Sequence, residues 1–336
     1  MKKLAVNISL QGLKLFRGFP LKRKYCGKVQ ILMFHRVVPT IGENRIDNGD
    51  IEVTVEYLEY LIGFYRKNGI QPASINDLQK ILSVKDDKRH VIFTFDDGYR
   101  DNLQYALPVF EKYNIPFTVY VTTDFIERKQ FAWWYFLEDI LRSNASIEVT
   151  EEGSLITLTT GTYDEKKKTF ALLREKIQKD KSVLASLMKR YEPDQELYHK
   201  LFLNCQELID LSKNPLVTIG SHTVSHPSLA KIADKELKQE LRDSKIIIEK
   251  WIGKEVKHFA YPFGTINDVG KREITAVENE GYETAITTGY GDVYVSSGLN
   301  LCALPRIWTS VDNDENELIK IIYGVNARKR GHKNDG

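Results

Sequence analysis

The 336-residue sequence has only three cysteines and lacks a long apolar run. Cys26, Cys205 and Cys302 are odd in number and far apart, which argues against a disulfide framework and against a zinc ribbon. No stretch approaches the roughly 20 apolar residues that a helix needs to cross a bilayer. The first residues resemble a secretory signal, but polar residues interrupt the apolar part and no small-residue cleavage site follows. We therefore expect a cytoplasmic protein.

Acidic side chains are absent from residues 1–42, which contain nine Lys or Arg, while all 46 Asp and Glu lie in the remainder. Residues 1–28 are predicted to be a basic amphipathic arm, with a mostly apolar helix at 3–17 that packs on the domain or lies at a membrane surface. A basic arm indicates an anionic partner, membrane or nucleic acid, or is simply solvated. We expect peripheral contact with the inner face of an anionic membrane and no nucleic acid. The tail 327–336 is predicted to be disordered and basic.

Short apolar runs alternate with helical patterns along most of the chain. Strands are expected at 29–35, 91–95, 115–121, 216–219, 258–261, 283–288 and 304–307, and helices at 53–70, 74–82, 103–113, 235–251, 269–279 and 314–323. This alternation predicts an α/β protein with a parallel sheet, and the number of units favours a barrel over a short open sheet. Residues 29–326 would form this domain. Residues 127–206 break the rhythm and are predicted to be a mainly helical insertion or lid, with a long helical stretch at 164–191.

The segment His90–Asn102 is the one around which the chain is organised. A buried-strand pattern ends there at two adjacent carboxylates, Asp96 and Asp97, and Gly98 follows before the next helix. Acidic groups at the carboxyl end of a buried strand lie where α/β folds place their chemistry. Alone, the same residues are equally compatible with a simple turn.

A second polar cluster changes that balance. His222 and His226 stand four residues apart directly after the strand expected at 216–219. On one helical turn, this spacing brings two imidazoles to the same face, close enough to share a cation. A barrel would bring them to the same mouth as Asp96 and Asp97. Two histidines and one aspartate make a three-ligand site with room for water, which suits catalytic zinc.

These residues carry a family resemblance. Thr94–Gly98 and His222–Pro227 resemble the first two motifs of the polysaccharide deacetylases, the NodB-homology group, and Tyr261–Gly264 resembles a variant of their third motif. The resemblance covers residues 29–126 and 207–325. It implies a distorted (β/α)7-type barrel and divalent-metal-dependent removal of acetyl groups from N-acetylhexosamines.

The resemblance also implies a role for each motif. Asp97, His222 and His226 would hold Zn²⁺ or another first-row ion, and Asp96 would be the general base toward a metal-bound water. The third motif would supply the substrate side of the site and an oxyanion donor, the backbone amide of Phe263; its residues are Tyr261, Pro262 and Phe263.

The chain departs from the family pattern in two places. The third motif normally has an arginine two residues before its proline, where this chain has Ala260. We expect Arg306 to replace it by pairing with Asp96 and keeping that carboxylate ionised. No late Leu-x-His motif supplies a general acid either. His35 ends the first strand in a manner that resembles poly-N-acetylglucosamine deacetylases, and among the seven histidines it alone ends a buried strand at the predicted mouth. A histidine that only caps this strand is the alternative.

The sequence thus predicts a hydrolase that removes an N-acetyl group from a glycan, a lipid-linked sugar or a polysaccharide precursor. An inactive barrel that binds carbohydrate is the alternative, but binding alone requires neither a base nor an acid. An iron oxygenase with two histidines and one carboxylate is disfavoured by the βα alternation. Trp133 and Trp134 are either sugar-stacking residues or part of the insertion's own core, and we expect core for at least one. The sequence does not indicate an oligomeric state.

Overall fold

The computed structural model describes residues 26–324 except 43–44, 47–50 and 152. The predicted helix at 3–17 and the tail 327–336 lie outside the described residues. Within them, no helix is both long enough and apolar enough to cross a membrane.

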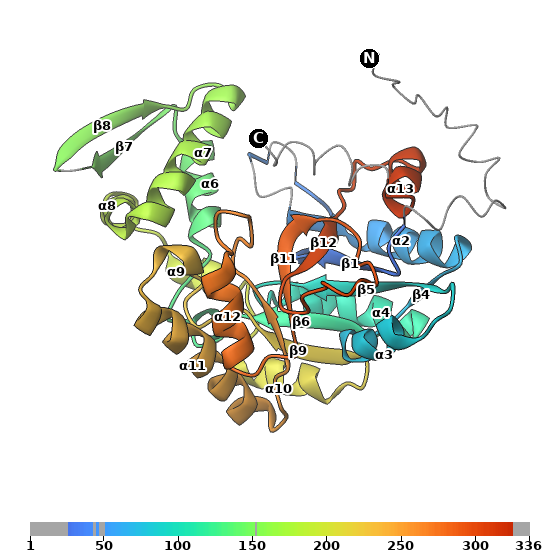
Figure 1. The fold of residues 1–336 in the computed structure, drawn as a ribbon. Helices are drawn as coiled ribbons and strands as arrows, with labels where there is room; N and C mark the ends of the chain where they lie inside the picture. The colour runs from blue at the N-terminus through green and yellow to red at the C-terminus, as the bar shows by residue number, and fades with distance from the viewer. Residues whose placement is uncertain (1–25, 43–44, 47–50, 152, 325–336) are drawn as a thin grey trace, which may run out of the picture.

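Seven parallel strands close into a barrel (Figure 1). β1 pairs with β12 on one side and with β5 on the other, which closes the ring β1-β12-β11-β10-β9-β6-β5. The predicted distorted (β/α)7 barrel is therefore confirmed. The strands are β1 (Val29–Phe34), β5 (Arg89–Phe95), β6 (Phe117–Val121), β9 (Val217–Ser221), β10 (His258–Ala260), β11 (Thr284–Tyr290) and β12 (Leu304–Trp308).

The distortion of the barrel lies along β5. An eighth strand, β4 (Ile70–Pro72), pairs with the first half of β5, whereas β6 pairs with its second half, from Phe93 to Phe95. β4 was not predicted from the sequence. It is only three residues long and contains a proline, which removes one donor and restricts such a segment to an edge.

Helices pack around the barrel and connect its strands (Figure 1). Several begin at the capping residues that the sequence offers. The hydroxyl of Thr54 accepts a hydrogen bond from the amide of Tyr57, and Asn204 and Glu207 form a capping box. The helices are α2 (Val55–Lys67), α3 (Leu78–Ser83), α4 (Leu107–Tyr113), α10 (Cys205–Lys213), α11 (Asp234–Ile252), α12 (Lys271–Asn279) and α13 (Glu315–Ile322).

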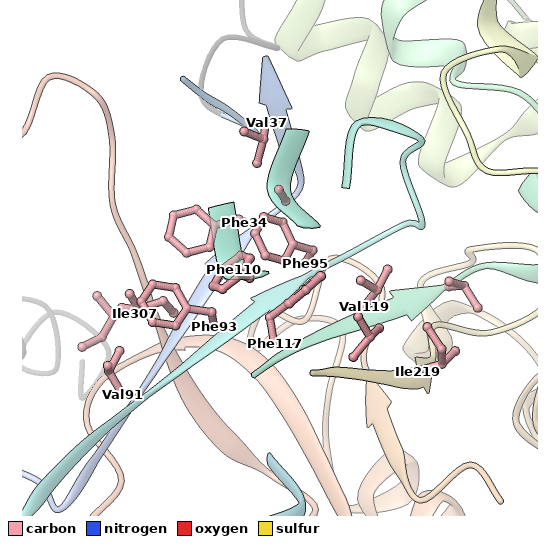
Figure 2. Packing of buried hydrophobic residues seen from close by; sticks show 14 of the residues in the cluster. Phe34, Val37, Val91, Phe93, Phe95, Phe110, Phe117, Val119, Ile219 and Ile307 are labelled. Atoms are coloured by element: carbon pink, nitrogen blue, oxygen red, sulfur yellow. The ribbon is translucent and has the colours of Figure 1, made fainter. Parts of the chain in front are cut away.

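Alternate residues of each strand face two different cores. Figure 2 shows Phe93, Phe95, Phe110 and Phe117 gathered between the strands and α4, with the rings of Phe110 and Phe117 4.4 Å apart. The intervening residues of β5 turn into the barrel, where Ile92 belongs to a separate buried cluster. This period of two directs the side chains of Thr94 and then Asp96 to the interior.

A glycine allows the interior of the barrel to be filled. A Cβ at Gly220 on β9 would lie 2.5 Å from Cε1 of Tyr120 on β6. The ring of Tyr120 is fully buried in the inner cluster. Only glycine leaves room for it at this position.

Residues 123–199 leave the barrel between β6 and β9 and extend away from it (Figure 1). The elements are α5 (Thr123–Ile126), α6 (Trp133–Ser143), an antiparallel hairpin of β7 (Ser146–Glu151) and β8 (Ser154–Thr159), α7 (Tyr163–Lys179), α8 (Lys181–Tyr191) and α9 (Gln195–His199). The long helical stretch predicted at 164–191 is two helices, because Asp180 ends α7 and caps α8.

This insertion has its own hydrophobic core, which extends to residues at the carboxyl ends of the barrel strands. Phe136, Leu137 and Phe170 are buried in it together with Tyr99, which follows β5. The rings of Tyr99 and Phe202 stack at 4.8 Å, and those of Phe125 and Phe202 at 4.3 Å. The insertion is therefore anchored beside the carboxyl ends of the barrel strands.

Candidate active site

Polar side chains converge at the carboxyl ends of the barrel strands. Asp96 and Asp97 follow β5, His222 and His226 follow β9, and His35 follows β1. All five line one cavity of ≈ 420 Å³. The parallel barrel therefore brings together residues from widely separated parts of the chain at one mouth.

Asp97, His222 and His226 form a compact set of ligand atoms. Oδ1 of Asp97 lies 3.4 Å from Nε2 of His222 and 3.3 Å from Nε2 of His226. Within the described part of the chain, no hydrogen-bond partner reaches this buried Oδ1. Nδ1–H of His222 donates to the carbonyl of Ala260 at 2.7 Å, which leaves Nε2 toward the site. These residues fit a divalent ion such as Zn²⁺ with coordination positions left for water and substrate.

The sequence pattern predicted a helical turn for the two histidines, but in the structure they do not lie on a helix. The segment is a loop in which Thr223 and His226 have left-handed backbone conformations, with φ of 71° and 56°. Glu240 of α11 holds the loop by accepting hydrogen bonds from the amide of Ser225 at 2.9 Å and from its hydroxyl at 2.6 Å. The rings of His222 and His226 nevertheless lie with centroids 4.9 Å apart. A tight loop thus achieves what the i, i+4 spacing was expected to achieve through a helix.

The charges of this cluster stabilise one another. Burial alone would raise the pKa of Asp97, but the imidazoles of His222 and His226 beside it hold that pKa well below its usual range. Burial lowers the pKa of His222, and the nearby carboxylates outweigh it and raise that pKa. Asp97 is therefore ionised, as a metal ligand must be.

Asp96 has a different partner. The guanidinium of Arg306 on β12 donates to both of its oxygens, at 2.8 and 2.7 Å, and both side chains are almost fully buried. Nε of Arg306 also donates to the carbonyl of Thr287 at 2.9 Å. Burial raises the pKa of Asp96, but Arg306 outweighs it and leaves the pKa below its usual value. The structure thus brings Arg306 to the carboxylate that Ala260 cannot reach.

His35 lies directly after β1 in the same cavity. Burial lowers the pKa of its imidazole, against the raising effect of Asp97 and Asp96. The side chain amide of Asn102 donates to the backbone carbonyl of His35 at 2.9 Å. The imidazole thus lies among the two carboxylates while its backbone is held from outside the cavity.

Comparison with known proteins places this site in a family. The family described as polysaccharide deacetylase matches residues 83–284, more than half of the chain. The chain belongs to the polysaccharide deacetylase family. It is accordingly a hydrolase of carbon–nitrogen bonds other than peptide bonds, and the predicted family and enzyme class are confirmed. The matched span contains Asp96, Asp97, His222 and His226, but neither β1 nor β12.

Individual relatives are distant but similar in fold. The protein YxkH of Bacillus subtilis (strain 168) is 20% identical over 293 residues, which are 86% of this chain and 74% of YxkH. The deacetylase PplD of Streptococcus pyogenes, solved in complex with acetate, has a TM-score of 0.60 and 17% identity over 88% of this chain and 99% of PplD. A de-N-acetylase of Aggregatibacter actinomycetemcomitans has a TM-score of 0.55 and 13% identity over 87% of this chain and 99% of that protein.

The third deacetylase motif forms one wall of the cavity. Phe263 has a left-handed backbone, with φ of 60°, and its ring centroid lies 4.9 Å from that of His226. The hydroxyl of Thr288 donates to the carbonyl of Phe263 at 2.8 Å and fixes this turn, in which Pro262 directly precedes Phe263. The hydroxyl of Tyr261 donates to a buried backbone carbonyl at 2.8 Å and is turned to the core.

The insertion contributes further residues to the lining of the cavity. Trp133 and Trp134 of α6 both line the cavity and both pack against the insertion's core. Nε1–H of Trp134 donates to the hydroxyl of Tyr99 at 3.1 Å, and its ring centroid lies 6.0 Å from that of His226. The insertion therefore reaches the cluster of Asp97, His222 and His226.

Other residues of the site were not indicated by the sequence analysis. Trp308, at the end of β12, lines the cavity and is 42% exposed. Arg36, Asp101 and Asn102 form buried polar contacts around the backbone of His35. The signal that could have indicated these three residues is their position in the sequence. Arg36 directly follows His35, and Asp101 and Asn102 end the segment His90–Asn102.

Proposed function

We propose that the protein is a metal-dependent deacetylase that removes the N-acetyl group from an N-acetylhexosamine in a glycan, a lipid-linked sugar or a polysaccharide precursor. The carrying observation is the convergence of Asp97, His222 and His226 beside a second carboxylate, Asp96, in one cavity. Family membership supports the proposal, as does the similarity in fold to a de-N-acetylase and to a deacetylase with bound acetate.

The ligand triad would hold Zn²⁺ or a similar ion, which supplies an activated water and polarises the acetyl carbonyl when bound. Asp96 is the residue to take the proton from the attacking water, a role typically worth about 10²–10⁴-fold in rate. Arg306 holds Asp96 ionised and in one orientation, because both carboxylate oxygens accept hydrogen bonds from it. The turn at Phe263 presents its backbone amide as a donor to the developing oxyanion.

The departing amine needs a proton, and we assign its donation to His35, which lines the same cavity. Burial lowers the pKa of its imidazole, which makes the imidazolium a stronger acid. Asp97 and Asp96 act in the opposite direction and favour the protonated form by their charge, but the pKa remains below its usual value. We expect activity to fall as the pH rises and His35 loses its proton.

The test is loss of one acetyl group from defined acceptors. The full-length protein would be incubated with Zn²⁺ and with N-acetylglucosamine oligomers, nucleotide sugars and lipid-linked sugars. Mass spectrometry would follow the loss of one acetyl, and an acetate assay its release. Chelation should abolish both signals and added metal should restore them. His226→Ala should lose metal and activity together, and unchanged metal stoichiometry in that variant would contradict the ligand assignment.

The insertion should influence the choice of acceptor. Trp133 lines the cavity from α6. Trp133→Ala should raise KM for longer oligomers more than for short ones, because a stacked sugar ring contributes binding outside the reacting unit. A variant with altered stability and unchanged KM would assign Trp133 to the insertion's core only.

We further propose that the protein acts in the cytoplasm, with its basic arm against an anionic membrane surface. The nine basic and no acidic residues in 1–42 support this. Flotation with vesicles containing anionic lipid at low salt should recover the full-length chain, and removal of residues 1–25 should abolish recovery. Full-length protein that ignores these vesicles would rule the contact out.

A further inference from the structure

The chain leaves the barrel at His35. β1 ends at Phe34, and the next residues form β2 (Arg36–Val38), which pairs with β3 (Glu52–Thr54) in a separate two-stranded sheet. His35 thus lies between two sheets and belongs to neither ladder. A residue at such a junction needs other contacts to fix the direction of its side chain.

Two consecutive residues provide those contacts. Asn102 Nδ2 donates to the carbonyl of His35 at 2.9 Å. The carboxylate of Asp101 accepts from Nε of Arg36 at 2.6 Å and from the amide of Val37 at 3.1 Å. Asn102 Nδ2 also donates to Asp101 at 3.2 Å, which joins the two side chains. Asp101 and Asn102 therefore hold three successive residues, His35 and Val37 through their backbone and Arg36 through its side chain.

Asp101 and Asn102 belong to the same short segment as Asp97, a proposed metal ligand. Asp101 and Asn102 lie four and five residues after Asp97, where a π-helical turn begins, and both are buried. Burial raises the pKa of Asp101 to about 6 despite the guanidinium of Arg36 beside it. A short piece of chain thus fixes both a metal ligand and the backbone of His35.

The insertion reinforces the same contacts. The guanidinium of Arg36 donates to Glu52 at 3.2 Å and lies 5.2 Å from the ring centroid of Tyr135 on α6. The hydroxyl of Tyr135 donates to the same Glu52 oxygen at 2.8 Å. Trp134, which precedes Tyr135 in the chain, lies with its ring against that of His226. Helix α6 therefore contacts both the ring of His226 and the polar residues around the backbone of His35.

We propose that Asp101 and Asn102 are positioning residues that hold His35 at a fixed place relative to Asp97. This inference rests on the proposed role of His35 as the general acid. Neither residue lines the cavity, and both act through their contacts with residues 35–37. Because small misplacements of a catalytic group cost orders of magnitude in rate, loosening the clamp should affect the step that His35 serves.

The experiment compares two leaving groups in Asp101→Asn, Asn102→Ala and His35→Ala. An N-acetylglucosamine oligomer has an amine leaving group that must be protonated, whereas 4-nitrophenyl acetate has one that leaves without a proton. We expect kcat on the oligomer to fall about tenfold or more in all three variants, with KM and metal content unchanged. On the aryl ester, all three should stay within about twofold of the wild type.

The chain offers a matched control in Asp292→Asn. Asp292 is also a buried aspartate, which accepts from the side chain of Gln30 at 2.8 Å and from the amide of Gly27 at 2.7 Å, at the start of β1. Its variant should lose stability as Asp101→Asn does, with kcat on both substrates unchanged. Asn102→Ala removes one neutral side chain with its two hydrogen bonds, to the carbonyl of His35 and to Asp101, and keeps the test valid if Asp101→Asn does not fold.

Two results would overturn the inference: equal losses on amide and ester in the Asp101 and Asn102 variants, or no loss on either. A near-normal kcat of His35→Ala on the oligomer is a different result. It would refute the proposed role of His35 as the general acid, on which this inference rests, rather than the contacts that hold His35.

Discussion

Replacing Arg306 by glutamine tests the electrostatic design of the barrel interior. The side chains of Asp96 and Arg306 are 3% and 1% exposed and share two hydrogen bonds. Arg306→Gln leaves the carboxylate buried without its counter-charge. Breaking a buried pair in this way costs about 3–5 kcal/mol of unfolding free energy, which is a factor of about 10²–10³ or more in the folding equilibrium.

The loss should depend on pH with a definite sign. In the wild type, the folded-state pKa of Asp96 lies below its usual value, so the pair stabilises the fold above that usual value and less as the pH falls through the folded one. In Arg306→Gln, burial is no longer opposed by Arg306, so the pKa of Asp96 rises. The difference in unfolding free energy between the two proteins should therefore be smallest at acidic pH and grow toward neutral pH.

Urea unfolding of the metal-free proteins at several pH values measures this difference. The double variant Asp96→Asn/Arg306→Gln carries no buried charge at this position and should recover part of the loss at neutral pH. A difference that is constant with pH, or a double variant no more stable than Arg306→Gln, would refute the reasoning. In the single variant Arg306→Gln, the acidic limb of the pH profile of kcat/KM should move to higher pH.

Three further changes have distinct expected results. Asp96→Asn should keep its metal and lower kcat by about 10²–10⁴-fold, and loss of metal instead would exchange the roles of the two aspartates. Gly220→Ala should cost about 1–3 kcal/mol in urea unfolding, because its Cβ would meet the ring of Tyr120 at 2.5 Å. Glu240→Gln weakens the hold on Ser225 and hence on the histidine loop, and should lower Zn²⁺ affinity about 10–100-fold in a chelator competition, with unchanged affinity contradicting that role.

The sequence predicted those parts of the fold that carry a clear period or end. The strands predicted at 91–95 and 304–307 are observed as the mostly buried β5 and β12, with seven and five residues. The ends of β5 and β9 place Asp96, Asp97 and His222 at one mouth. Arg306 reaches Asp96 because residues of β12 alternate between the interior and the outer core. Strand-end position was thus enough to predict which residues meet.

Other parts lacked such a signal. β2, β3 and β4 have three residues each, too few to show alternation. The loop from His222 to His226 was assigned to a helical turn because spacing does not reveal the left-handed conformations that bend it. Asp101 resembles an ordinary residue before a helix, and its contact with Arg36 depends on how β1 ends. These features follow from tertiary packing rather than from local pattern.

The insertion also bears on how the fold can change over evolution. β6 and β9 are hydrogen-bonded neighbours, yet 95 residues (122–216) separate them, against the 21 residues (96–116) that connect β5 to β6. Chain-closure entropy grows only with the logarithm of length, so this excursion costs about 1 kcal/mol more than the shorter connection. The outer helices and the β7–β8 hairpin are therefore free to be lengthened, trimmed or exchanged between relatives. Helix α6 is not, since Trp134 and Tyr135 tie it by hydrogen bonds to Tyr99, which follows β5, and to Glu52 of β3.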